Sequence, residues 1–341
     1  MVDLTDAPDY DIVSSSVKMP YRERPYEEFT FTDPLLTGYK AIVAEDSKSP
    51  VGDNLTTFII RFPRAVLSEI NTHRVFSRNS ASSRARSIRS TIRGVMTEPY
   101  IPAFTVNQRG MSGKFMNASD QELHQKAYLR IRDRAVKGVL ELMVGEGDDI
   151  IAENYEAVVD RYYETIYNSG GVSPHKQNLN RILEPFMWHE SVVTSRHWEN
   201  FYNLRDDLEH ADPAVYAIAR LMRAASEASE PGSHSLHLPF VDEVERDSAE
   251  TWSFEEAYPL LMRSATEAAQ VSYADKASQS RSTATVELGE KLLSLGHMSP
   301  FEHVAYRGQD HDFPSNLSPS WIQLRTILES GQEEQINVSR Y

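Results

Sequence analysis

The sequence contains no cysteine among its 341 residues. This absence excludes thiolate nucleophiles, disulfides, Fe–S clusters and thiolate zinc sites. Any chemistry that the chain performs must therefore use His, Arg, Ser, carboxylates or a bound cofactor.

The sequence also lacks the apolar run of about 20 residues that a membrane helix needs. Its first residues, "MVDLTDAPDYDIVSSS", lack the basic and apolar regions of a signal peptide. Hydrophobic residues make up 40% of the chain and charged residues 25%. These features predict a soluble, globular, cytoplasmic protein without a membrane partner.

Familiar ligand-binding motifs are missing too. The chain has no Walker-type loop, and "GEGDD" at Gly145 lacks the preceding strand and the third glycine of a Rossmann fingerprint. His234 and His237 in "HSLH" have the spacing of metal ligands on a helix, but Pro239 and Gly232 crowd them and no nearby carboxylate completes a set. We expect packed or solvated histidines and no metal site.

A formal net charge of −15 argues against a general nucleic-acid binder. The stretch "NTHRVFSRNSASSRARSIRS", residues 71–90, nevertheless holds arginines at 74, 78, 84, 86 and 89, interleaved with serines and without an acidic residue. Guanidinium groups beside hydroxyl donors suit a phosphate ligand. The alternative is a solvated basic loop that pairs with the protein's own carboxylates.

Residue patterns predict strands at 39–45 and 55–62, followed by a helix over 63–74 that Pro63 opens. The arginine stretch would then be a loop, as would residues 91–118. A capping box at Ser119 and Glu122 predicts a long helix that ends near Gly145. Further helices are expected over 149–167 and 173–185, which together would form a helical layer.

Two later segments carry polar clusters. If a helix begins near Thr194, Arg196 and Asn200 share one face and Arg205 lies about 180° away. If both faces are functional, the sites are shared between subunits. The alternative is that these are ordinary surface arginines on an amphipathic helix. "GHMSPFEH", residues 296–303, predicts a helix start with Ser299 as N-cap and Glu302 at N3. Such a start also offers backbone N–H groups to an anion.

Together these stretches resemble the flavin-dependent thymidylate synthase family. The signature of that family is Arg-His-Arg-x-x-Ser-x-Asn-x-x-Ser-x-Arg, and residues 72–84 read "THRVFSRNSASSR", with Thr72 as the only departure at a fixed position. "NRILEP" with Arg181, "SRHWENFYNLR" with Arg196, Asn200 and Arg205, and "GHMSPFEH" match three further motifs.

The order of the motifs is unusual. In the family, GH-x-SPFEH precedes the arginine motif, whereas here it follows by more than 200 residues. The resemblance implies a circularly permuted, bacteriophage-type α+β fold, with a central mixed or antiparallel sheet and a helical layer. We expect a single catalytic domain over 1–341, made of an N-terminal extension and strand (1–50), a core (51–240) and a C-terminal segment with the fourth motif (241–341).

The resemblance also implies an activity. Family members methylate dUMP reductively to dTMP, with FAD as cofactor and with NADPH and methylenetetrahydrofolate as co-substrates. A homotetramer with sites shared between subunits is expected, in the host cytoplasm if the protein is phage-encoded. Reduced flavin supplies the hydride and no cysteine nucleophile is used, which agrees with the composition.

Site residues follow position by position from the resemblance. The expected FAD contacts are Thr72, His73, Arg74, Ser80, Thr194, Ser195, Arg196, Asn200, His210, His297, Ser299 and Glu302. The expected nucleotide contacts are Glu69, Ser80, Ser82, Ser83, Arg84, Arg181 and Arg205. Arg205 corresponds to the catalytic residue that lies against the uracil edge and favours ionisation at N3.

Departures from the family leave the substrate open. Glu69 replaces a Gln, Ser80 replaces a Glu and Ala85 replaces a Tyr. These exchanges move a carboxylate, and an acceptor near the base favours a base with an amino donor. A C5 hydroxymethylase or methylase of dUMP or dCMP is therefore an alternative. A non-catalytic nucleotide- or RNA-binding homologue is another.

Overall fold

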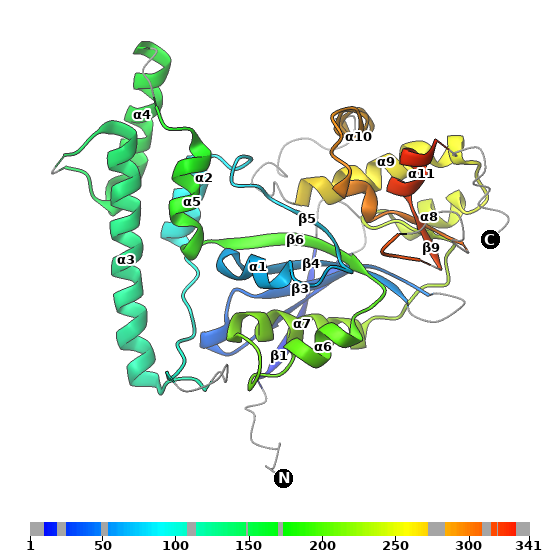
Figure 1. The fold of residues 1–341 in the computed structure, drawn as a ribbon, viewed down its shortest axis with the longest axis horizontal. Helices are drawn as coiled ribbons and strands as arrows, with labels where there is room; N and C mark the ends of the chain where they lie inside the picture. The colour runs from blue at the N-terminus through cyan, green and yellow to red at the C-terminus, as the bar shows by residue number, and fades with distance from the viewer. Residues whose placement is uncertain are drawn as a thin grey trace, which may run out of the picture.

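The structure is a computed structural model that describes residues 10–18, 25–48, 54–107, 114–147, 149–169, 173–271, 284–308, 315–318 and 320–331. A six-stranded sheet of order β1-β2-β3-β4-β6-β5 forms the centre, and every pairing in it is antiparallel. Helices cover the sheet, so the predicted α+β class is confirmed (Figure 1). No helix among the described residues is both long and apolar enough to cross a membrane.

The strands of this sheet place β4 at its centre. Their bounds are Ile12–Val17 (β1), Tyr26–Phe31 (β2), Lys40–Ser47 (β3), Leu55–Pro63 (β4), Ser77–Ser80 (β5) and Trp188–Ser195 (β6). Strand β4, "LTTFIIRFP", is buried at all but one position because its β-branched and aromatic side chains pack on both faces. The strands expected at 39–45 and 55–62 are confirmed.

One face of the sheet packs against α6 (Glu199–Arg205) and α7 (Pro213–Ala228). Phe58, Ile60 and Phe62 of β4 point to this side and join one core with α7. Asp212 caps α7 by accepting a hydrogen bond from the Ala214 N–H at 2.8 Å. An aspartate followed by a proline is a typical sequence signal for a helix start, and α7 begins there.

The opposite face packs against the C-terminal elements. These are α8 (Glu243–Ala249), α9 (Phe254–Val271), α10 (Ala284–Ser294), α11 (Leu324–Ser330), the short helix η7 (Ser299–Glu302) and a small sheet of β7 (Leu236–His237), β8 (Ala305–Arg307) and β9 (Trp321–Gln323). Phe240 and Ala268 contribute to one core with Ile59 of β4 and Val192 of β6. The last third of the chain thus covers the sheet made by the first two thirds.

The predicted helical layer is present at one end of the sheet (Figure 1). It consists of α2 (Ile88–Thr97), α3 (Ala118–Val144), α4 (Tyr155–Ser169) and α5 (Lys176–Leu183), with the short helices η4 (Ala152–Asn154) and η5 (Glu184–Phe186) beside them. Helix α3 ends at Gly145 as expected, but Asn117 rather than Ser119 caps its start, with 3.0 Å from its Oδ1 to the Asp120 N. The loop expected over 91–118 is wrong at its beginning, which α2 occupies; residues 108–113 lie outside the described residues.

Three further predictions around the arginine stretch are wrong. The helix over 63–74 shrinks to η3 (Arg64–Val66) and α1 (Leu67–Ile70). Part of the stretch forms strand β5, and Thr194 belongs to strand β6 and not to a helix. Strand pairing explains the last two outcomes, because β5 and β6 satisfy each other's N–H and C=O groups, which burial would otherwise leave without partners.

A buried ion pair joins the sheet to the C-terminal elements. Arg246 Nη1 of α8 lies 2.7 Å from Glu45 Oε1 of β3, and both side chains are 4% exposed. We expect Arg246→Met to lower the free energy of unfolding in urea by about 3–5 kcal/mol, because it leaves a buried carboxylate without its cation. The double variant Arg246→Met with Glu45→Gln should recover most of that loss. A single variant as stable as the parent would show that Glu45 is solvated.

Candidate functional site

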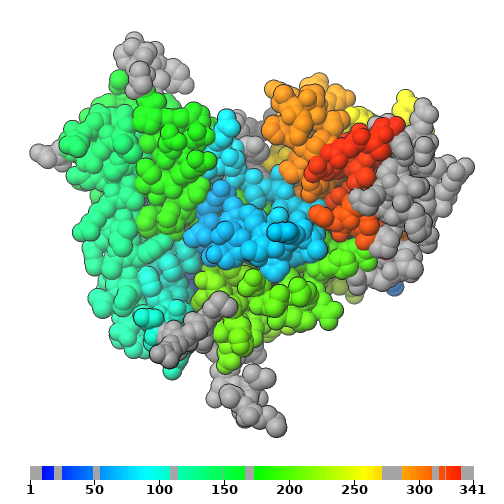
Figure 2. All heavy atoms as spheres, in the orientation of Figure 1, coloured from blue at the N-terminus to red at the C-terminus, as the bar shows by residue number. Residues whose placement is uncertain are grey.

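The candidate site is built around the edge strand β5, which pairs only with β6 in the sheet order. Its register, Ser77 opposite Thr194 and Ser80 opposite Ser191, places two of the motifs side by side. Residues around β5 reach the surface between the helical layer and the C-terminal elements (Figure 2). Arg74 precedes β5, Arg78 lies within it, and Arg84, Arg86 and Arg89 follow it.

His73 and Arg205 meet on one face of the sheet. The Arg205 Nε–H donates to His73 Nε2 at 3.2 Å, so that this ring nitrogen is unprotonated. The His73 ring stacks on Phe76, with centroids 5.4 Å apart, and contacts the edge of Phe201. Burial, followed by the charges of Arg205 and Arg78, lowers the pKa of His73. The predicted catalytic arginine therefore lies against a neutral imidazole.

Asn79 connects the opposite face of β5 to the fourth motif. Its Oδ1 accepts from the Ser299 Oγ–H at 3.1 Å, and its Nδ2 donates to the Ala268 carbonyl at 2.8 Å. Ser299 is thus not the predicted N-cap: it begins η7, a four-residue 3₁₀ helix, and its hydroxyl bonds across to β5. Glu302 of η7 forms an ion pair of 2.5 Å with Arg325.

A second cationic group, Arg64, Arg86 and Arg181, lies past the other end of β5. Arg64 Nη1 donates to the Ala81 carbonyl at 2.9 Å and to His189 Nδ1 at 3.1 Å. Burial lowers the pKa of Arg64, with smaller effects from the nearby charges of Arg86 and Arg181 in the same direction, while Glu184 opposes them. Three arginines thus gather where the sequence suggested a phosphate site.

Arg64 is the residue of this group that sequence reasoning missed. It was placed inside an expected helix, whereas the structure turns its guanidinium toward the loop after β5. The buried Asn180 of α5 holds the same loop by donating to the carbonyls of Ser83, at 2.8 Å, and Arg86, at 3.1 Å. This contact brings Arg181, the next residue, beside the loop. No sequence spacing would have connected Arg64 with it.

The prediction of a helix with ligands on two faces is wrong. Arg196 lies between β6 and α6, is 9% exposed, and donates from Nη1 to the Ser318 carbonyl. Only Asn200 and Arg205 lie on α6, where Asn200 is exposed. Because Arg196 and Arg205 do not share a helix, their periodicity no longer argues for sites shared between subunits.

The remaining predicted residues differ in how closely they join the site. Ser80 Oγ lies 2.8 Å from Ser191 Oγ, and Ser195 Oγ accepts from the His197 N–H at 3.1 Å. His210 is exposed and paired with Asp207 at 2.7 Å, which raises its pKa. The other exposed predicted residues are Glu69, Thr72, Arg74, Ser82, Arg84, Arg181 and His297, whereas Ser83 and Thr194 are buried.

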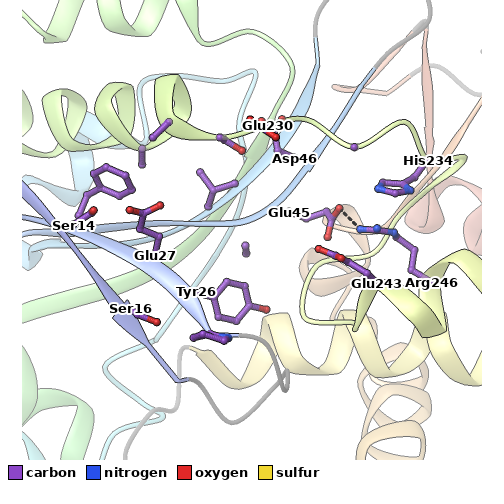
Figure 3. Close-up of a pocket in the computed structure, with 18 of the residues that line it drawn as sticks. Ser14, Ser16, Tyr26, Glu27, Glu45, Asp46, Glu230, His234, Glu243 and Arg246 are labelled. Atoms are coloured by element: carbon purple, nitrogen blue, oxygen red, sulfur yellow. Dashed lines mark hydrogen bonds and ion pairs between the residues drawn. The ribbon is translucent and has the colours of Figure 1, made fainter.

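A separate cavity of about 780 Å³ lies between β1, β2, β3 and α8. Carboxylates of Glu27, Asp46, Glu230 and Glu243 surround it, with the Glu45–Arg246 pair on one wall (Figure 3). None of the predicted site residues lines this cavity. Within the described residues, no group of three or more His, Cys, Asp or Glu side chains is arranged to hold a metal ion.

Comparisons with known proteins find only distant structural similarity. No protein-family model and no curated protein matches the sequence. A solved structure of the UMP/dUMP methylase PolB from Streptomyces cacaoi bound with 5-Br UMP aligns at 16% identity and a TM-score of 0.32, over 51% of this chain and 69% of that chain. Its complex with 5-Br dUMP aligns at 16% identity and a TM-score of 0.34, over 51% and 65%. Alignments at this level do not establish a common fold.

The contact between Arg205 and His73 gives a testable pKa. We expect Arg205→Met to raise the pKa of His73, because the variant removes a nearby positive charge and a donor that favours the neutral ring. A pH titration of the His73 ring protons by NMR measures this, with Arg93→Met in the helical layer as a control. An unchanged pKa in Arg205→Met would contradict the contact.

Proposed function

We propose that the protein is a flavin-dependent enzyme that methylates a pyrimidine deoxynucleotide at C5, with dUMP converted to dTMP as the leading reaction. The observation that carries this proposal is the convergence of four sequence motifs on β5. Asn79 bonds to Ser299, which is 220 residues away, and His73 bonds to Arg205, which is 132 residues away. Motifs that resemble a family in sequence thus lie together in space, including "GHMSPFEH", whose position in the chain is permuted.

The nucleotide phosphate would bind at the cationic group beyond β5. Arg181 lies near Arg64, and Arg84 is exposed in the loop after β5. Arg64 adds a guanidinium that is 15% exposed and whose Nη2 lies 3.5 Å from Glu184 Oε1. The positive charges of Arg86 and Arg181 near Arg64 favour a dianion, which relieves their repulsion. Arg89 forms an ion pair of 2.5 Å with Asp160, as the solvated-loop alternative predicts for a structural arginine.

The side chains around His73 fit a flavin dinucleotide. Thr72 and Arg74 are exposed beside the His73–Arg205 pair. Arg74 offers donors to a pyrophosphate, whereas the Thr72 hydroxyl donates to the Glu69 carbonyl at 2.6 Å and can accept a hydrogen bond. When bound, reduced flavin would supply the hydride, and NADPH would supply the electrons that reduce the flavin. Arg205 would hold a positive charge against the pyrimidine edge, which stabilises the base when N3 loses its proton.

The alternative substrate is a cytosine nucleotide. Glu69 is an exposed carboxylate on α1 that accepts only from the neighbouring Ser68 Oγ–H, at 2.7 Å, among its described contacts. Its free lone pairs could accept from the amino group of cytosine, whereas uracil offers a carbonyl there. A hydroxymethylated product belongs to the same alternative. A non-catalytic homologue would bind the nucleotide at the arginines without flavin.

The reaction itself tests the proposal. We expect the purified protein to take up FAD, to lose its flavin absorbance with NADPH, and to form dTMP from dUMP and methylenetetrahydrofolate. Competition between dUMP and dCMP identifies the base, because only the accepted nucleotide should turn over. A protein that cannot take up FAD would contradict the enzyme and leave the non-catalytic homologue.

Matched arginine variants test the phosphate site within the same assay. Arg181→Ala removes a charged contact to the nucleotide, worth about 1.5–3 kcal/mol, and should weaken nucleotide binding roughly 10- to 100-fold. Arg89→Ala is the control, since Arg89 already pairs with Asp160. Equal effects of the two variants would place the phosphate elsewhere.

We also propose that the enzyme is a homotetramer whose copies complete one another's sites. Many predicted contacts are exposed in the single chain, among them Thr72, Arg74, Arg84, Arg181 and Asn200, whereas cofactor sites bury most of their ligand. Light scattering should give about four times the chain mass of 38.7 kDa. A monomeric mass for the FAD-loaded, active protein would contradict shared sites.

A further inference from the structure

A buried chain of hydrogen bonds connects β3 to the fourth motif. Ser47 Oγ lies 2.8 Å from His237 Nδ1, and His237 Nε2 lies 2.8 Å from Thr57 Oγ1. Thr57 Oγ1 lies 2.6 Å from Thr194 Oγ1, which lies 2.7 Å from His303 Nδ1. All five side chains are fully buried. These hydrogen bonds therefore connect the central sheet to the C-terminal elements without contact with water.

The chain of hydrogen bonds ends at His303. His303 Nε2 is buried and has no hydrogen-bond partner among the described residues. Burial lowers the pKa of His303 to about 3 and that of His237 well below its usual value. Both rings are therefore neutral, and each carries one N–H and one lone pair.

Counting protons leaves two arrangements. Three hydrogen bonds join the two rings, and the hydroxyls of Thr57 and Thr194 supply only two hydrogens, so at least one ring must donate. If both rings donated, one threonine hydrogen would have no acceptor among these groups, so we consider the two arrangements in which a single ring donates. If His303 donates from Nδ1, every hydrogen bond runs toward Ser47. If His237 donates from Nε2, every hydrogen bond runs toward His303, and the proton of His303 resides on Nε2.

The two arrangements differ in what they leave unsatisfied. In the first, the His303 Nε2 lone pair has no donor and the Ser47 O–H has no acceptor among the described contacts. In the second, Ser47 donates to His237 Nδ1, and only the His303 Nε2–H has no partner. Each buried unsatisfied polar group costs about 1–3 kcal/mol, so the second arrangement is favoured.

We propose that His237 is a positioning residue that fixes the tautomer of His303 through Thr57 and Thr194, with the His303 proton on Nε2. The "GHMSPFEH" motif then presents a hydrogen-bond donor at its last residue. Ser47 sets the direction of the hydrogen bonds, because a serine hydroxyl that donates to His237 Nδ1 leaves only Nε2 of that ring to carry the proton. This inference concerns the protein without ligands and does not depend on the proposed reaction.

The ring nitrogens report the tautomers directly. In long-range ¹H–¹⁵N NMR spectra of the full-length protein, assigned with His237→Gln and His303→Gln, we expect His237 and His303 both to be protonated at Nε2 and unprotonated at Nδ1. Thr57→Val keeps the shape but removes the hydroxyl, so His303 should populate both tautomers and give averaged shifts. Thr57→Ser keeps the hydroxyl and should restore the parental shifts.

Two results would overturn the proposal. One is a parent protein in which His303 carries its proton on Nδ1. The other is a folded Thr57→Val whose His303 shifts equal those of the parent, because the hydroxyl relay would then have no effect. If Thr57→Val fails to fold, Ser47→Ala serves instead: loss of its donor should release both rings, and unchanged shifts at both would equally refute the coupling.

Discussion

The pairing of β5 with β6 is the interaction on which the candidate site depends. Four residues, Ser77–Ser80, pair with β6, and their alternating side chains face opposite sides of the sheet. On one side Arg78 donates to the carbonyls of Ile70 and His73, while on the other Asn79 holds Ser299. A slip of one residue in this register would exchange these two sets of contacts. The strand is short, so side-chain contacts on both faces must define its register.

The sequence predicted those parts of the fold whose pattern is local. Strand β4 reads as a buried strand because of its β-branched and aromatic residues, and α7 reads as a helix because Asp212 and Pro213 mark its start. Strand β5 could not be predicted, since "SRNS" has no strand propensity and forms a strand only because β6 offers backbone partners. The same reason explains Thr194, whose helical surroundings are overridden by pairing with Ser77.

The site was predictable only where residues belong to motifs. His73, Asn79, Arg205 and Ser299 came from the motifs, and the structure brings them into contact in pairs. Arg64 was missed because it stands alone in the sequence, and its partners Ala81 and His189 are distant in the chain. The histidines of "HSLH" were expected to be packed or solvated, and His237 is packed. Its role in a hydrogen-bond chain depends on Ser47 and Thr57, which no spacing relates to it.

The bond between Asn79 and Ser299 has a consequence for biosynthesis. During translation, β5 and β6 are complete long before the residues that cover their second face have been made. The nascent sheet would expose Ile59, Val192 and the open edge of β5, which is a surface prone to aggregation. Contacts of such long sequence separation also form slowly. The motif order thus makes the chain dependent on its last third for protection of its own sheet, and a chain truncated before Phe240 would leave this aggregation-prone surface uncovered.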